Sequence, residues 1–239
     1  MFRAAISIIL VFLSISVNAL SSFDKHYLSV TKGMSAFYMY LLSSEDKRFN
    51  QDFNRYFKEA TSHISQSSDP VDKQFSQKWQ ELLPTLKYEQ MVGMGASLNE
   101  NIRGNFRKYA VDLFLEHKNR QKKSLNTVEA LGRIQLNTFL LSARALDVDS
   151  TIYGTTMFTQ HDFLLDQAEV FKQIQLDLEF LQTSKLSEAA FIQLRRIQAK
   201  LDFMKSSLID YNTQSATYLL YQNALSITKI IKKLTSNNV

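Results

Sequence analysis

The chain has 239 residues, an apolar fraction of 45% and a formal charge of +5, which is ample material for one or two packed domains. Six glycines and two prolines leave little for the tight turns of an all-β protein, and the lack of cysteine excludes disulfides and thiolate metal sites. The composition therefore predicts an all-α fold that relies on packing alone.

The first 19 residues have the pattern of a signal peptide. Arg3 gives a basic start, residues 4–13 are apolar, and residues 17–19 (Val-Asn-Ala) place small side chains before a cleavage site. We expect cleavage after Ala19 and export of a soluble protein, to the periplasm or beyond in a bacterium. The alternative is an uncleaved membrane anchor, but the serines at residues 21–22 interrupt the apolar run before it reaches a spanning length.

Apolar residues at three- and four-residue steps predict three helices in the N-terminal half of the mature chain. Asp69-Pro70 is typical of a helix start, because proline is tolerated at the first helical position. Pro84 kinks or ends the helix that follows. Two glycines within residues 91–95 predict a bend between the halves of the molecule. The expected helices span residues 23–42, 45–66 and 70–83.

The C-terminal half begins with a capping-box pattern at residues 97–100, Ser-Leu-Asn-Glu, which predicts a helix with a basic end. A second helix covers residues 127–146, and residues 147–160, rich in Asp, Thr and Gly, form the longest non-helical candidate. Ser187 opens the last and longest helix, because alternating steps of three and four to Lys229 give one mostly apolar seam. Between the non-helical segment and this last helix we expect an amphipathic helix whose apolar residues are Phe163, Leu164, Phe171, Leu178 and Leu181.

The helix over residues 127–146 is the expected hub, because its apolar side chains occupy too many directions for a surface helix. Polar atoms on such a helix need partners, so its polar residues are either core hydrogen-bonders or a ligand site. Arg133 keeps its charge and needs an acceptor. That acceptor is an anionic or carbonyl-bearing ligand, or a carboxylate such as Asp147, Asp149 or Asp166. The candidate ligand-binding residues are Arg133, Gln135, Asn137 and Thr138.

The excess positive charge is local, since seven Lys and Arg residues between positions 103 and 123 face only two acidic ones. One interpretation is a surface that contacts an acidic partner or anionic lipid. The other is a solvated helix end, where basic side chains suit the C-terminal dipole. Nucleic acid is not an expected partner, because the segment has few aromatic residues and the protein is exported. The candidate partner-binding residues are Arg103, Arg107, Lys108, Lys118, Arg120, Lys122 and Lys123.

The two halves have a similar order of elements, which suggests an internal repeat. Residues 34–86 and 132–208 each contain an apolar helix, a helix with spaced Phe and Leu, and a third helix with a large aromatic residue. Trp79 and Phe203 are these aromatic residues, and we expect both to be buried at comparable places. The repeat predicts an elongated bundle of two stacked three- or four-helix modules. The module boundaries are residues 20–96 and 97–239, after a signal peptide over residues 1–19.

Sequence patterns for catalysis are mostly missing. The chain has no phosphate-binding glycine loop, no nucleophile elbow and no paired Glu-x-x-His sequences. His161 with Asp162 and Asp166 is the one group at metal-ligand spacing, and a helix start with polar side chains explains it equally. We therefore expect neither an enzyme nor a cofactor.

Residues 132–138, Gly-Arg-Ile-Gln-Leu-Asn-Thr, and the helices around them resemble the periplasmic sensor domain of type IV pilus methyl-accepting chemotaxis transducers, the PilJ-type helical module. The family's usual pattern is Gly-Arg-x-Arg-Met-Leu-Ser-Gln-Arg. Gly132 and Arg133 match this pattern, whereas Gln135 and Leu140 occupy two of its basic positions. The resemblance implies a sensor-like module whose partner is a membrane receptor or a pilus-related protein.

The sequence supports two hypotheses about function. In the first, the protein is an exported, non-enzymatic, sensor-like module that binds a small ligand or a membrane-receptor partner in the periplasm. In the second, it is a helical adaptor or assembly factor that binds only protein partners. Neither hypothesis needs a cofactor, and both leave a homodimer open.

Overall fold

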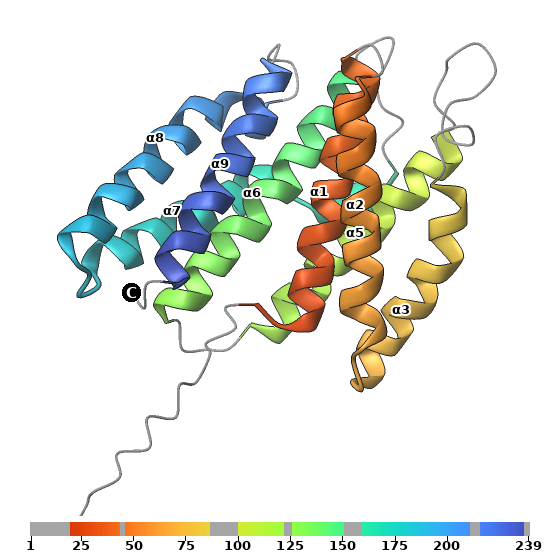
Figure 1. The fold of residues 1–239 in the computed structure, drawn as a ribbon, viewed down its shortest axis with the longest axis horizontal. Helices are drawn as coiled ribbons and strands as arrows, with labels where there is room; N and C mark the ends of the chain where they lie inside the picture. The colour runs from red at the N-terminus through yellow and green to blue at the C-terminus, as the bar shows by residue number, and fades with distance from the viewer. Residues whose placement is uncertain are drawn as a thin grey trace, which may run out of the picture.

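The computed structural model describes residues 20–43, 46–86, 100–121, 126–150, 159–210 and 216–236. Within these residues the chain forms eight α-helices and two 3₁₀ helices and no β-strand (Figure 1), so the predicted all-α class is confirmed. The elements are α1 (Ser22–Leu42), α2 (Lys47–Ser65), α3 (Pro70–Leu82), η1 (Leu83–Thr85), α5 (Glu100–Arg120), α6 (Thr127–Asp149), η2 (Asp162–Leu164), α7 (Gln167–Thr183), α8 (Glu188–Ile209) and α9 (Thr217–Ser236).

Two central helices, α1 and α6, organise the molecule. In α6, 18 of 23 residues are buried, and in α1, 15 of 21 are buried. In Figure 1, α2, α3 and α5 lie on one side of this central pair, and α7, α8 and α9 lie on the other. The predicted hub helix is therefore confirmed as a buried element, and α1 is a second one.

Aromatic packing joins α1 to α2, α3 and α5. Gly33 of α1 allows the closest approach, because a Cβ atom at this position would lie 2.3 Å from the ring of Phe57. The Phe57 ring in turn packs edge-on against Trp79, with 5.5 Å between ring centroids, and against Phe106 at 5.6 Å. Trp79 is fully buried, as predicted, and its indole N–H donates to the hydroxyl of Thr61 at 2.8 Å.

Two of the helix starts show why short polar residues precede them. Asp69 accepts hydrogen bonds from the N–H groups of Val71 and Asp72 at 2.8 and 3.1 Å, and Pro70 occupies the first position of α3 as predicted. Asn126 caps α6 in a capping box with Glu129. Of the capping box expected at residues 97–100, the first three residues lie outside the described residues, and α5 begins at the fourth, Glu100.

The prediction of one long final helix is wrong, because α8 ends at Ile209 and α9 begins at Thr217. Asp210 has an extended backbone (φ −117°, ψ 108°), and the two helices pack against each other. The predicted seam holds within α8, where Leu194, Ile197, Leu201, Met204 and Leu208 are buried. In α9 the buried positions start a new register with Leu220, Tyr221, Ala224, Ile227, Ile231 and Leu234.

Three apolar residues that were expected inside lie at the surface. Phe203 is 57% exposed, so its predicted match to the buried Trp79 is wrong. Phe163 and Leu164 are also exposed, because they belong to η2 and not to the helix that starts at Gln167. An aromatic residue one position away from an apolar seam points sideways, and its type alone does not place it in the core.

The hydrophobic core is continuous across both helix groups, from Phe23 to Leu234. Helix α5 contacts α1 and η2, and its aromatic side chains pack on α2 and α3. The module boundary expected after residue 96 assigns α5 to the C-terminal module. In the structure, α5 packs against the helices of the N-terminal module, α1, α2 and α3, as well as against η2.

Candidate functional site

Arg133 projects from α6 toward α7, where the carboxylate of Asp177 pairs with it. Its Nε lies 3.1 Å from Oδ2 of Asp177, and its Nη1 lies 3.3 Å from Oε1 of Gln121. Burial raises the pKa of Asp177, the ion pair with Arg133 opposes this shift, and the net pKa is raised. A carboxylate thus neutralises Arg133, but it comes from α7 and is none of the three acidic residues that the sequence suggested.

The other three candidate ligand-binding residues are buried and distributed around α6. At 3.6 residues per turn, Asn137 lies on the side of Arg133, whereas Gln135 and Thr138 lie on another side. The hydroxyl of Thr138 donates to the carbonyl of Ile134 at 2.6 Å, so the helix itself satisfies it. Oδ1 of Asn137 is buried without a hydrogen-bond partner among the described residues. The four residues therefore do not form one ligand-binding surface.

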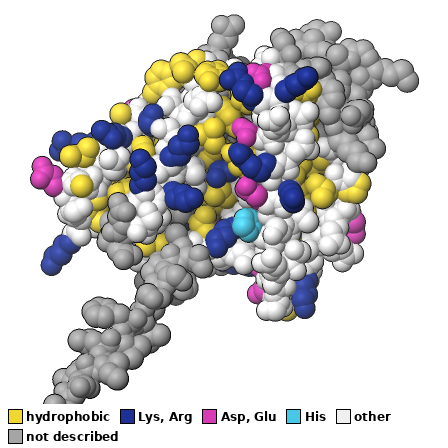
Figure 2. All heavy atoms as spheres, viewed as in Figure 1, with side chains coloured by type: hydrophobic (Ala, Val, Ile, Leu, Met, Phe, Trp, Pro, Cys, Tyr) yellow, Lys and Arg dark blue, Asp and Glu magenta, His cyan; other side chains and the backbone are white. Residues whose placement is uncertain are grey.

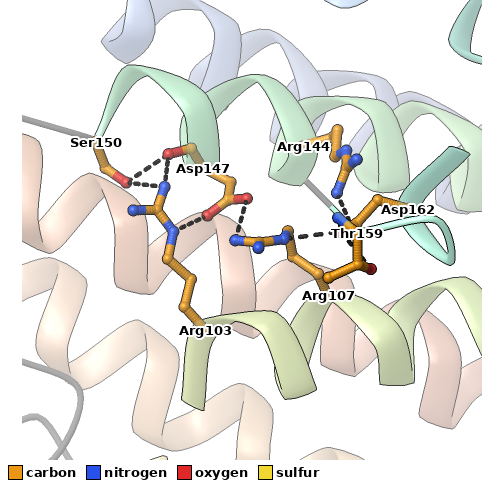
Figure 3. A network of polar contacts seen from close by, with 7 residues as sticks. All are labelled: Arg103, Arg107, Arg144, Asp147, Ser150, Thr159 and Asp162. Carbon is orange, nitrogen blue, oxygen red and sulfur yellow. Dashed lines mark hydrogen bonds and ion pairs between the residues drawn. The ribbon is translucent and has the colours of Figure 1, made fainter. Parts of the chain in front are cut away.

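Five charged side chains meet inside the molecule, where α5, α6 and η2 come together (Figure 3). Arg107 lies between two carboxylates, with Nη1 3.5 Å from Oδ2 of Asp147 and Nε 3.3 Å from Oδ1 of Asp162. Arg103 binds both the carboxylate and the backbone carbonyl of Asp147. Nη1 of Arg144 lies 2.7 Å from Oδ1 of Asp162. We call these five residues the buried ion-pair network.

The network fixes the position of α5 and η2 on the hub helix. Its side chains are at most 7% exposed, so each charge depends on its partners for stability. Thr159 adds two hydrogen bonds to Asp162, from its N–H at 2.8 Å and its hydroxyl at 2.9 Å. Burial raises the pKa of Asp162, but the hydrogen bond from Thr159 and the pairing with Arg144 lower it, and the net pKa lies below its usual value. These mutual contacts give the network a structural role.

The prediction that Arg103 and Arg107 belong to an exposed basic surface is wrong, because they are 1% and 2% exposed. Both lie on the face of α5 that carries the buried residues Phe106 and Ala110, at three- and four-residue steps. This spacing was present in the sequence. An arginine within an apolar stripe points into the core, and there it needs a buried carboxylate.

The remaining candidate partner-binding residues are one half-buried arginine, two exposed lysines and two lysines outside the described residues. Nη1 of Arg120 lies 2.7 Å from Oδ1 of Asp72, which attaches the end of α5 to α3. Lys108 and Lys118 are exposed, and residues 122–123 lie outside the described residues. The basic segment therefore does not present its charges as one continuous surface.

The histidine and carboxylates at metal-ligand spacing have separate partners. Nε2 of His161 lies 2.9 Å from Oδ1 of Asp112 on α5. Asp166 instead caps α7 and accepts the N–H of Glu169 at 3.1 Å. In the part of the chain that the structure describes, no three His, Cys, Asp or Glu residues are grouped so that they could hold a metal ion.

A groove of about 790 Å³ lies between α8 and α9. We call it the α8–α9 groove. In Figure 2, Lys and Arg side chains and hydrophobic side chains gather over these two helices. Phe203 and Leu219, at 57% and 47% exposed, are large apolar residues of the lining, and Ile230 is a third. Its cationic residues are Arg196, Lys200, Lys229 and Lys233.

The groove is positively charged because four cations line it and, among the described residues, no acidic side chain does. Along α8 and α9 together, seven Lys and Arg residues face only Glu188 and Asp202. Nζ of Lys200 donates to Oδ1 of Asn223 at 3.1 Å. The other three cations have no carboxylate partner within the described residues. Sequence reasoning missed this site, because one continuous helix over residues 187–229 would have had no groove.

Comparisons with known proteins add no relative. No protein-family model matches the chain, and neither the curated proteins nor the solved structures gave a match. None of the helices in the described ranges is long and apolar enough to cross a membrane.

Proposed function

We propose that this protein is a non-enzymatic helical module whose α8–α9 groove binds a protein partner. The supporting observation is the contrast between two charged regions of the protein, the buried ion-pair network and the α8–α9 groove. The interior arginines pair with aspartates, whereas Arg196, Lys229 and Lys233 lie beside exposed apolar side chains and have no carboxylate partner among the described residues. Exposed aromatic and aliphatic groups rimmed by polar ones are typical of interaction sites.

A small-ligand sensor centred on α6 has less support. Asp177 already holds the guanidinium of Arg133, and Gln135 and Thr138 lie on another side of the buried helix. The PilJ-type resemblance remains an argument for a sensor-like module with a membrane-receptor or pilus-related partner. The groove favours the second hypothesis, an adaptor that binds protein partners, because this candidate binding surface lies on α8 and α9 and not on the hub helix α6.

We further propose that the module acts after export, in the periplasm or outside the cell. The support is the basic start, apolar run and small-residue site within residues 1–19.

Site-specific photo-crosslinking tests the proposed function. A photo-reactive amino acid in place of Leu219 should give an adduct of one discrete mass in the cells that make the protein. The same substitution at Leu176 of α7 is the matched control, because both leucines are 47% exposed and only Leu219 lines the groove. Adducts at neither position, or the same adducts at both, would contradict a binding role for the groove.

A further inference from the structure

The α8–α9 groove has the length of a short helix. Its lining extends from Gln193 to Phe203 on α8 and from Leu219 to Lys233 on α9. At a rise of 1.5 Å per residue, these spans correspond to about 15 and 21 Å. A partner helix of about 10–14 residues would cover both walls.

Small residues lie midway along each wall of the groove. Ala199 is central on α8, and Ser226 is central on α9. Helices pack with their axes about 8–10 Å apart, and small residues at the contact allow the shorter distances. A third helix could therefore pack in the groove, in contact with both α8 and α9.

The groove has an apolar end and a cationic end. The hydrogen bond between Lys200 and Asn223 shows which levels of the two helices face each other. Because the chain turns back after α8, Phe203 and Leu219 lie together on the side of this contact nearer the turn. The other three cations lie toward the opposite end, where Ile230 adds an apolar contact.

We propose that the groove seats an acidic amphipathic helix of a partner protein. The apolar face of that helix would contact Phe203 and Leu219, and its carboxylates would lie beside Arg196, Lys229 and Lys233. Charge complementarity identifies this partner, since the described residues of the lining include four cations and no acidic side chain. Helix-in-groove binding uses apolar anchors at three- and four-residue steps along the bound helix. The residues that line the groove recur at the same steps along α8 and α9. This inference rests on the proposed function of the groove.

Two other occupants fit less well. A second copy of the chain, seated through the same face, would bring identical cations together across a two-fold axis. A membrane surface would attract the lysines, but it is flat on this scale and would leave a hollow of about 790 Å³ unfilled. A helix satisfies both the charge and the shape.

The test uses the purified mature chain and a synthetic helix of about 14 residues with leucine on one face and glutamate on the others. Fluorescence anisotropy should show binding that weakens as sodium chloride rises from about 50 to 500 mM, since salt screens rim charges. The same peptide with glutamine in place of glutamate should bind at least about tenfold more weakly. Vesicles of phosphatidylglycerol serve as the alternative probe.

Matched variants of the protein locate the binding site. The double variant Lys229→Gln/Lys233→Gln should weaken binding of the acidic peptide about fivefold. The control Lys205→Gln/Lys232→Gln removes two exposed lysines of the same helices that do not line the groove, and it should bind like the wild type. Equal losses in both double variants would mean that net charge, and not the groove, attracts the peptide.

The outcomes separate this inference from the function on which it rests. Equal binding of the glutamate and glutamine peptides, or vesicle binding that depends on Lys229 and Lys233 without peptide binding, would overturn the acidic-helix partner. If Leu219 still gave its specific adduct in cells, the proposed function would stand with a partner of other chemistry. Loss of both the adduct and the peptide binding would overturn both.

Discussion

The position of an arginine relative to an apolar stripe decides its environment in α5. Arg103 and Arg107 are one turn apart on the stripe and are buried, whereas Lys108, one residue further, points to solvent. The sequence could have predicted this difference from spacing alone. It could not have predicted the carboxylate that pairs with Arg103, because Asp147 is 44 residues away and only the tertiary fold brings it close.

Neighbouring substitutions in α5 should test the buried ion-pair network. Arg107→Met is expected to lower the free energy of unfolding by about 1–3 kcal/mol, because it removes the arginine that Asp147 and Asp162 share and leaves each carboxylate with one arginine partner. Lys108→Met should change it by less than about 0.5 kcal/mol, since that side chain is exposed. Urea denaturation followed by circular dichroism measures both values. Similar small losses in the two variants would show that Arg107 is not needed inside.

Arg133 can be tested through its partner on α7. Arg133→Met alone should destabilise the protein by about 3 kcal/mol, because Asp177 would remain buried and uncompensated. Adding Asp177→Leu should recover most of that loss, since an apolar pair can replace a buried ion pair. Urea denaturation of the two single variants and the double variant gives the coupling energy. Independent, additive effects would contradict a structural ion pair and return Arg133 to the ligand hypothesis.

At the scale of elements, helix starts could be predicted better than the end of the chain. Asp69-Pro70 marks the start of α3 correctly, because its chemistry acts within a few residues. The seam from Leu194 to Leu208 was also correct, but its continuation past Asp210 was not. A step pattern of threes and fours can be extended across a turn by chance, and only the packing of α9 on α8 and α6 shows the new register.

Two phenylalanines provide a test of the corrected alignment of the halves. Phe203→Ala should cost less than about 1 kcal/mol of stability, because the ring is 57% exposed. Phe171→Ala on α7 removes the same side chain from a site that is 2% exposed, and it should cost about 3–5 kcal/mol. Thermal or urea unfolding of the pair gives the comparison. A large loss for Phe203→Ala would restore the repeat in which it matches Trp79.

At the scale of the whole molecule, two charged regions differ: the arginines of the buried ion-pair network have carboxylate partners, whereas three cations of the α8–α9 groove have none among the described residues. Composition and periodicity predicted the all-α class and the buried hub, because both depend on the average properties of long segments. The groove depends on how two surface helices meet, and a side chain such as Phe203 looks the same in sequence whether it lines a groove or a core. The polar residues of the hub helix could therefore be chosen as candidates from the sequence. The exposed groove could be recognised only once the packing of α8 and α9 was known.

The proposed export concerns the whole chain and can be measured directly. We expect mass spectrometry of the protein from its native cells to show an N-terminus at Leu20, because residues 17–19 supply small side chains before the cut. Replacing Ala19 with a bulky residue such as phenylalanine should block processing and leave the precursor in the membrane fraction. A wild-type protein that keeps Met1 would refute the export proposal.

Acid sensitivity of the whole fold should arise at His26, which lies at the meeting point of four helices. Its Nδ1 lies 2.8 Å from the carbonyl of Ala60 on α2, and its Nε2 lies 2.7 Å from the hydroxyl of Tyr109 on α5. The ring packs edge-on against Trp79 of α3 at 5.4 Å. Burial lowers the pKa of His26 from 6.5 to about 4, although the hydrogen bond to Ala60 opposes the shift. The folded protein therefore keeps this ring neutral in mildly acidic solution.

The pH dependence follows from the direction of that shift. Below pH 6.5 the unfolded chain binds a proton at His26 and the folded chain does not until about pH 4, so stability falls as the pH drops through this window. The loss between pH 7 and pH 5 should be about 2 kcal/mol in urea denaturation. His26→Gln, although less stable at pH 7, should lose much less over the same range, whereas His63→Gln, at a half-buried site, should keep most of the wild-type dependence. An unchanged pH dependence in His26→Gln would show that the acid sensitivity comes from another group.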